Sequence, residues 1–159
     1  MTLVVNTYST RILAISKWLQ NERKETLYNA GRLIAVSEFH SANEPSLEEA
    51  LTQISAAYEH TGLGRLKIVE AGASRLILRL DNCATCIDAK NDGNTYCWID
   101  AGFIAGSLEN LLHERYDAVE TKCRGTGHNY CEFRVIQSKW KPLRQSKSRD
   151  CKPFELMPI

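Results

Sequence analysis

This sequence lacks the features that are typical of membrane-spanning proteins and of nucleotide-binding proteins. Its 159 residues contain no apolar run near the ~18 residues that span a bilayer, and the longest resemble Leu33–Val36. The first residues, MTLVVNTYSTR, have no charged segment leading into a long apolar stretch, so we expect no secretory leader. Neither GxGxxG nor GxxxxGK[ST] occurs, and no nucleotide site is indicated. We expect a cytoplasmic protein without a membrane segment.

There is also little net charge, but its distribution is uneven. The chain carries +1 overall, with 14 basic and 17 acidic residues in 1–137 against six basic and two acidic in 138–159. A mildly acidic body gives no electrostatic footprint for nucleic acid. The length suits one domain. We predict a single domain over 1–137 and a basic, flexible C-terminal tail over 138–159, with contact to an anionic partner as the alternative role for the tail.

Hydrophobic periodicity predicts helices first and paired strands afterwards. Apolar residues recur at helical spacing over 9–22, 24–40 and 46–60, and Ser46 and Glu49 form a capping-box pattern. Alternation with period two predicts one hairpin over 65–81 and a second over 116–137, separated by an apolar helix over 96–114. The sequence therefore predicts an α+β fold: N-terminal helices on an antiparallel sheet of about four strands, with one long helix between two hairpins.

Six cysteines in a chain without a leader indicate metal ligands or reactive thiols rather than disulfides. A hairpin brings Cys123 and Cys131 together, with Glu120 three residues before Cys123. In a regular strand, Glu120 and Cys123 would point to opposite faces, so a shared metal requires a bend there. Cys97, where the long helix starts, could complete the set. Three thiolates and one carboxylate would make a closed, structural zinc site.

The same cysteines allow other interpretations. The Cys83-Ala-Thr-Cys86 motif could form a zinc site with Cys123 and Cys131, or act as a redox pair. Buried cysteines also occur as ordinary small apolar residues. Spacing alone leaves these alternatives open.

Several motifs in order resemble the 4-vinyl reductase domain family. They are Leu27-Tyr-Asn-Ala-Gly-Arg, then the stretch from Cys97-Trp-Ile-Asp-Ala-Gly to Leu112, then Val119-Glu-Thr-Lys-Cys123 and Gly127-His-Asn-Tyr-Cys131-Glu-Phe-Arg-Val. The resemblance covers about residues 25–137. It implies a fold shared with transport-particle (TRAPP) subunits and a family that includes hydrocarbon-binding proteins and aromatic-responsive sensor domains. It also implies zinc ligands, which fall on Cys97, Glu120, Cys123 and Cys131.

The long helix is the second feature with a functional interpretation. Gly102 and Gly106 lie four residues apart on one face, where another backbone or a flat ligand could approach closely. Plain core packing is the alternative. The resemblance implies an apolar pocket between this helix, the 24–40 helix and the sheet. Its expected lining, with the two glycines, is Tyr28, Arg32, Phe39, Trp98, Gly102, Phe103, Ile104, Gly106 and Leu108.

Together these observations predict a domain that binds or senses a small apolar or aromatic molecule, hydrocarbon-like or tetrapyrrole-like, with a structural zinc. The alternatives are an accessory enzyme or pigment-biosynthesis factor using Cys83 and Cys86, or a TRAPP-like adaptor. No residues are assigned to catalysis, and we expect a binding domain rather than an enzyme. By family analogy we expect a homodimer and a further protein partner. The residues expected between the two chains are Ile12, Ile15, Trp18 and Leu19.

Overall fold

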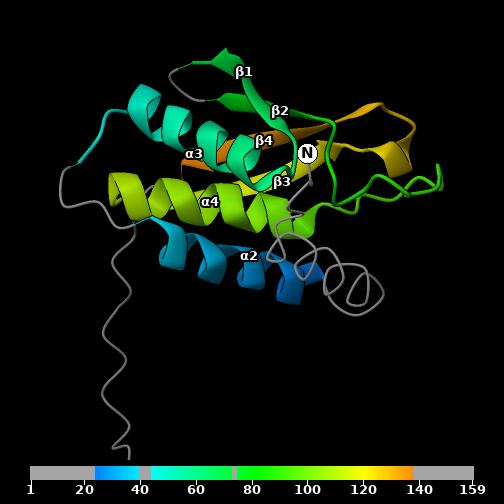
Figure 1. Ribbon diagram of the computed structural model, residues 1–159, viewed down its shortest axis with the longest axis horizontal. Coiled ribbons are helices and arrows are strands. Elements are labelled where there is room, and N and C mark those ends of the chain that lie inside the picture. Colours follow the sequence, from blue (N-terminus) through cyan, green and yellow to red (C-terminus); the bar gives the residue numbers. More distant parts are fainter. Residues whose placement is uncertain (1–23, 40–43, 73–74, 138–159) are drawn as a thin grey trace, which may run out of the picture.

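The computed structural model describes residues 24–39, 44–72 and 75–137. Three helices lie on one side of a four-stranded antiparallel sheet, and the predicted α+β fold is confirmed (Figure 1). The predicted helix over 9–22, with its expected dimer contacts, and the tail over 138–159 lie outside the described residues. None of the helices within the described ranges combines the length and apolar character needed to cross a membrane.

The first two described helices have clear local causes. Helix α2 (Lys24–Glu38) buries a narrow stripe that includes Leu27, Gly31 and Ala35. Helix α3 (Leu47–Thr61) begins at the predicted capping box, in which the Ser46 hydroxyl accepts from the backbone N–H of Glu49 and the Glu49 carboxylate accepts from that of Ser46. It ends at Gly62, whose φ of 70° is left-handed.

The sheet is built from two hairpins joined edge to edge. Strands β1 (Arg65–Ala71) and β2 (Leu76–Asp81) form the first, and β3 (Tyr116–Lys122) and β4 (Tyr130–Gln137) the second. Because β2 pairs with β4, the strand order is β1-β2-β4-β3. Alternate residues face the helices, and the register places Leu78 beside Phe133 and Leu80 beside Cys131. The inner face of the sheet therefore continues the apolar core up to the cysteines.

Helix α4 (Trp98–Leu112) lies in the middle of the molecule, with α2 on one side and α3 and the sheet on the other (Figure 1). Its glycines permit this position. A Cβ on Gly102 would lie 1.9 Å from the carbonyl oxygen of Tyr28, and one on Gly106 would lie 2.8 Å from the Cα of Arg32. Gly31 makes the reciprocal approach, 2.0 Å from the carbonyl oxygen of Ile99. Small residues on both helices thus bring the two backbones into contact.

Candidate metal centre and adjoining cavity

Five cysteines and one glutamate gather where α4 begins and the second hairpin turns. Cys83 and Cys86 lie in the loop after β2, and Cys97 is the residue that caps the N-terminus of α4. The second hairpin supplies Glu120 on β3, Cys123 just after it, and Cys131 on β4. All six side chains are buried, and the five thiols are free rather than paired in disulfides. The fold thus concentrates six metal-ligand groups in its core.

A β-bulge in β3 lies between Glu120 and Cys123, whose side chains would point to opposite faces of a regular strand. The register runs from Glu120 opposite Phe133 to Lys122 opposite Glu132, so Thr121 is an extra residue on β3. One extra residue reverses the alternation of side chains beyond it. Cys123 consequently faces the same side of the sheet as Glu120, and both are buried. The bend that a shared metal requires is present.

The six groups form two overlapping sets of four. Ligand atoms lie within 4.8 Å of one another in a carboxylate set, which comprises Cys97, Glu120, Cys123 and Cys131, and in a CxxC set, which comprises Cys83, Cys86, Cys97 and Cys131. The structure brings the four zinc ligands predicted from the sequence together as the carboxylate set. The alternative set predicted from the sequence joined Cys83 and Cys86 to Cys123 and Cys131. Among the described residues, the group that contains the CxxC motif has Cys97 where that prediction had Cys123.

Glu120 is oriented for ligation. Its Oε2 atom accepts the backbone N–H of Cys97 at 2.8 Å, whereas its Oε1 atom is buried and has no hydrogen-bond partner among residues 24–39, 44–72 and 75–137. Burial raises the pKa of this carboxyl to about 8, and the nearby Cys123 adds to the rise. A buried carboxylate oxygen without a partner costs free energy unless a cation binds it. The residues present therefore fit a metal ion.

The thiols affect one another's ionisation. Hydrogen bonds from neighbouring cysteines lower the pKa of Cys86 to about 4 and that of Cys123 to about 6. The same neighbours raise the pKa of Cys131, and burial raises that of Cys97. At neutral pH, these shifts favour the thiolate form of Cys86 and Cys123 and the protonated form of Cys97 and Cys131. Thiolates are the form of cysteine that binds metals.

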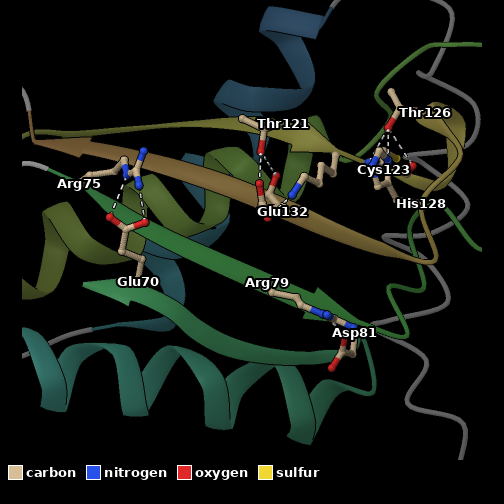
Figure 2. A network of polar contacts seen from close by, with 10 residues as sticks. Glu70, Arg75, Arg79, Asp81, Thr121, Cys123, Thr126, His128 and Glu132 are labelled. Carbon is tan, nitrogen blue, oxygen red and sulfur yellow. Dashed lines mark hydrogen bonds and ion pairs between the residues drawn. The ribbon is translucent and has the colours of Figure 1, made fainter. Parts of the chain in front are cut away.

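A tight turn fixes Cys123 (Figure 2). The Thr126 hydroxyl accepts the backbone N–H of Cys123 at 2.8 Å, donates to its carbonyl oxygen at 2.9 Å, and lies 3.1 Å from Nδ1 of His128. Gly127, with a φ of 82°, closes the turn. The carboxylate set is therefore held by backbone geometry as well as by packing.

A small cavity of about 50 Å³ lies next to the metal-ligand groups, between α2, α3 and α4. Its lining is mostly apolar and consists of Ile34, Glu38, Ala57, Tyr58, Thr61, Leu63, Thr85, Ile99, Asp100 and Phe103. Asp100, in the first turn of α4, is fully buried there. The Tyr58 hydroxyl donates to its Oδ1 atom at 3.2 Å, whereas Oδ2 has no hydrogen-bond partner within the described part of the chain. Burial raises the pKa of Asp100 to about 7.

The residues predicted to line a ligand pocket do not share one environment in the structure. Phe103 lines the cavity, and its ring packs against those of Phe39 and Tyr58 with centroids 5.9 and 5.6 Å apart. Gly102 and Gly106 face the backbone of α2. Ile104 and Leu108 lie in the core, and Trp98 donates through its indole N–H to the carbonyl oxygen of Thr95.

The other two predicted residues, Tyr28 and Arg32, tie α2 to its neighbours. The Tyr28 hydroxyl accepts the backbone N–H of Ala118 on β3, while Arg32 pairs with Glu109 of α4 and donates to the carbonyl oxygen of Tyr116. Sequence reasoning missed Tyr58 and Asp100 as cavity residues. One signal was visible: Asp100 is the only acidic residue within the first ten of the apolar α4 segment.

The fold and these groups define the class: an α+β domain whose core holds a thiolate-rich candidate metal centre beside a small cavity. Residues 76–137, from β2 to β4, match the family model of the V4R domain. Among curated relatives, the uncharacterized protein MJ0150 of Methanocaldococcus jannaschii is 36% identical over 112 residues, which are 69% of this chain and 62% of that protein. The chain thus spans about three fifths of that relative.

Solved structures with the same fold are more distant in sequence. A vinyl-4-reductase family protein from M. jannaschii has a TM-score of 0.59 at 17% identity, covering 87% of this chain and 84% of that one. The phenol-responsive sensory domain of the transcription activator PoxR, solved with phenol, has a TM-score of 0.56 at 14% identity, with coverages of 86% and 76%. A trafficking protein particle complex subunit 3 from Naegleria fowleri, covalently bound to palmitic acid, has a TM-score of 0.65 at 14% identity, with coverages of 86% and 96%. The expected TRAPP-like fold is confirmed.

Proposed function

We propose that this domain binds or senses a small apolar or aromatic molecule that carries one hydrogen-bond donor, and that a structural zinc in the carboxylate set supports the binding site. The ligand would enter the cavity between α2, α3 and α4. The observation that carries the proposal is the buried Oδ2 atom of Asp100, which meets no hydrogen-bond partner at normal distance among the described residues and faces a mostly apolar cavity. A donor on the ligand would satisfy that oxygen, while the walls would pack against its apolar body.

The size of the cavity favours a monocyclic ligand. An apolar cavity of about 150 Å³ holds benzene, so the cavity of about 50 Å³ must widen before a ring can enter. Phe103 is only half-buried and Glu38 is exposed, so both stand at the accessible side of the cavity. Rotation of the Phe103 ring would provide space. A tetrapyrrole would require a far larger rearrangement of the three helices.

Two relatives in fold support an apolar ligand. PoxR carries phenol in its sensory domain, and the Naegleria subunit carries palmitic acid. The first is an aromatic ring with one hydroxyl, which matches the chemistry of the cavity here. The second shows that an apolar chain is also held by a protein of this fold.

Zinc is supported by the donor chemistry of the carboxylate set. Three thiolates and a carboxylate form a closed four-coordinate site, which suits a structural rather than a catalytic ion. Cys97 and Asp100 share the first turn of α4, so the zinc would fix the helix end on which the cavity depends. This arrangement would make the cavity sensitive to loss of the metal.

Ligand binding is tested with phenol and toluene as probes, measured by calorimetry on the full chain. At about pH 8, above the pKa of about 7 that burial gives Asp100, phenol is expected to bind about tenfold or more tightly than toluene, because a hydrogen bond to a charged group contributes about 1.5–3 kcal/mol. Ala57→Leu, which fills the cavity wall, should abolish phenol binding. Ala56→Leu is the matched control, because Ala56 is exposed on the same helix. Equal phenol affinity in wild type and Ala57→Leu, with both folded, would remove the ligand from this cavity.

The alternative of an enzyme that uses Cys83 and Cys86 as a redox pair has less support. Both thiols are buried and make sulfur contacts within the cluster, at 3.5 Å from Cys83 to Cys97 and 3.3 Å from Cys86 to Cys131. Thiol–disulfide exchange requires an accessible sulfur. The cluster favours ligation.

A further inference from the structure

We infer that the centre holds two zinc ions, one in the carboxylate set and a second in the CxxC set, bridged by the thiolates of Cys97 and Cys131. This inference extends the proposed structural zinc by a second ion and by a role for Cys83 and Cys86. It rests on the proposed function for the first ion only.

The number of ligand groups exceeds what one ion uses. A structural zinc binds four ligands, whereas six buried groups converge here. With one ion in the carboxylate set, two buried thiols in the CxxC loop have no metal. With one ion in the CxxC set, the Oε1 atom of Glu120 stays buried and finds no partner in the part of the chain that the structure describes. Each single-ion arrangement leaves part of the cluster unused.

The overlap between the two sets has the pattern of two tetrahedra that share an edge. Such a pair has six corners, of which two belong to both. The two sets share two members, Cys97 and Cys131, and each has two of its own. Glu120 and Cys123, at the end of β3, would be terminal ligands of one ion. Cys83 and Cys86, in the loop after β2, would be terminal ligands of the other.

The sulfur positions agree with this assignment. The shared pair, Cys97 and Cys131, is 3.4 Å apart between Sγ atoms. On the CxxC side, each terminal sulfur contacts one shared sulfur: Cys83 lies 3.5 Å from Cys97, and Cys86 lies 3.3 Å from Cys131. A Zn–S bond of ~2.3 Å places two sulfurs of one tetrahedron about 3.8 Å apart. The Sγ–Sγ distances in this cluster are slightly shorter than that value. They suit two ions that share thiolates, and the cluster would need only a small expansion to admit both ions.

Charge does not oppose a second ion. Five thiolates and one carboxylate around two Zn²⁺ leave a net charge of −2, which equals that of one Zn²⁺ with three thiolates and one carboxylate. The N-terminal end of α4 at Cys97 contributes a favourable positive dipole in both cases. The second ion therefore neutralises the CxxC thiolates without increasing the buried charge.

The test is zinc content per chain, measured by native mass spectrometry and elemental analysis on full-length protein loaded with zinc and then desalted. Wild type should hold two zinc ions. Cys83→Ser/Cys86→Ser should hold one, and Glu120→Gln/Cys123→Ser should hold one. Cys151 lies outside the described residues and is assigned to neither set, so Cys151→Ser is the cysteine-to-serine control and should hold two. Circular dichroism checks that each variant is folded, and the single variants Cys83→Ser and Glu120→Gln serve where a double variant unfolds.

Cobalt(II) titration gives a second measurement, because thiolate-to-cobalt charge-transfer absorption should rise to two equivalents in wild type and to one in either double variant. One ion in wild type and one in Cys83→Ser/Cys86→Ser would overturn the second site while leaving the proposed zinc intact. One ion in wild type and none in Cys83→Ser/Cys86→Ser would overturn both assignments in favour of a lone CxxC site. Iron with acid-labile sulfide, or no metal in any variant, would also overturn both.

Discussion

The carboxylate of Glu120 accepts the backbone N–H of Cys97 at 2.8 Å, and this contact joins β3 to the first turn of α4 across 23 residues of sequence. One oxygen of Glu120 therefore contacts the helix end, while the other meets no hydrogen-bond partner among the described residues and could bind a metal ion. Asp100 stands one turn further along the same helix, so the candidate metal centre and the cavity are both built on the first turn of α4.

Replacing Glu120 should weaken zinc binding less than replacing Cys123. Glu120→Gln keeps an oxygen that can accept the Cys97 N–H but loses the anionic ligand, whereas Cys123→Ser loses a thiolate. Zinc affinity should fall about 10–100-fold or more in Cys123→Ser, and less in Glu120→Gln. Competition with a chelator of known affinity measures both. Equal affinities in wild type and Cys123→Ser would show that Cys123 is not a ligand.

Enlarging the glycines of α4 should destabilise the domain. Gly102→Ala places a methyl group 1.9 Å from the Tyr28 carbonyl oxygen, and Gly106→Leu forces α2 away from α4. We expect losses of about 1–3 kcal/mol or more in the free energy of unfolding. Gly72→Ala is the control, because a Cβ there has its nearest neighbour at 3.6 Å. Urea denaturation reports the differences; a Gly106→Leu protein as stable as Gly72→Ala would argue against close helix packing.

Asp100 should make stability depend on pH. Burial raises its folded-state pKa to about 7 from the ordinary value of 3.8, so its favourable contribution to stability is fully present below the unfolded pKa and is lost as pH rises through 7. Asp100→Asn removes this dependence. The stability of Asp100→Asn relative to wild type should therefore increase between about pH 4 and pH 8. Melts of the two proteins across this range measure it, and parallel curves would contradict the assignment.

The homodimer expected from the family analogy stays a prediction, since Ile12, Ile15, Trp18 and Leu19 lie outside the described residues. Helix α2 also has two large apolar side chains that are exposed in one chain: Leu33 at 72% and Val36 at 55%. Light scattering at micromolar concentration should give about twice the 18.0 kDa of one chain. A single 18.0 kDa species would contradict the dimer.

Much of this architecture could be predicted because its signals are local. The capping box before α3 and the alternation in β1, β2 and β4 predicted those elements to within one or two residues. The spacing and the family resemblance predicted that Cys97, Glu120, Cys123 and Cys131 come together, and the structure places their ligand atoms within 4.8 Å of one another. Zinc in this set stays a prediction. The bulge at Thr121 could not, because it depends on the pairing of β3 with β4.

The cavity was harder to predict for a related reason. Glycines at helical spacing permit either a ligand or a second helix to approach, and only the placement of α2 decides between them. Likewise, the role of Cys83 and Cys86 depends on where the loop after β2 folds. Long-range packing brings this loop beside Cys97 and Cys131.

Zinc content of Cys97→Ser beside wild type tests the central claim most directly, because Cys97 belongs to both ligand sets and begins the helix that carries Asp100. Native mass spectrometry of the two full-length proteins should show stoichiometric zinc on wild type and at least one zinc ion fewer per chain on Cys97→Ser. The melting temperature of the variant should fall as well, because metal binding is coupled to folding. Unchanged zinc and an unchanged melting temperature in Cys97→Ser would contradict the metal centre.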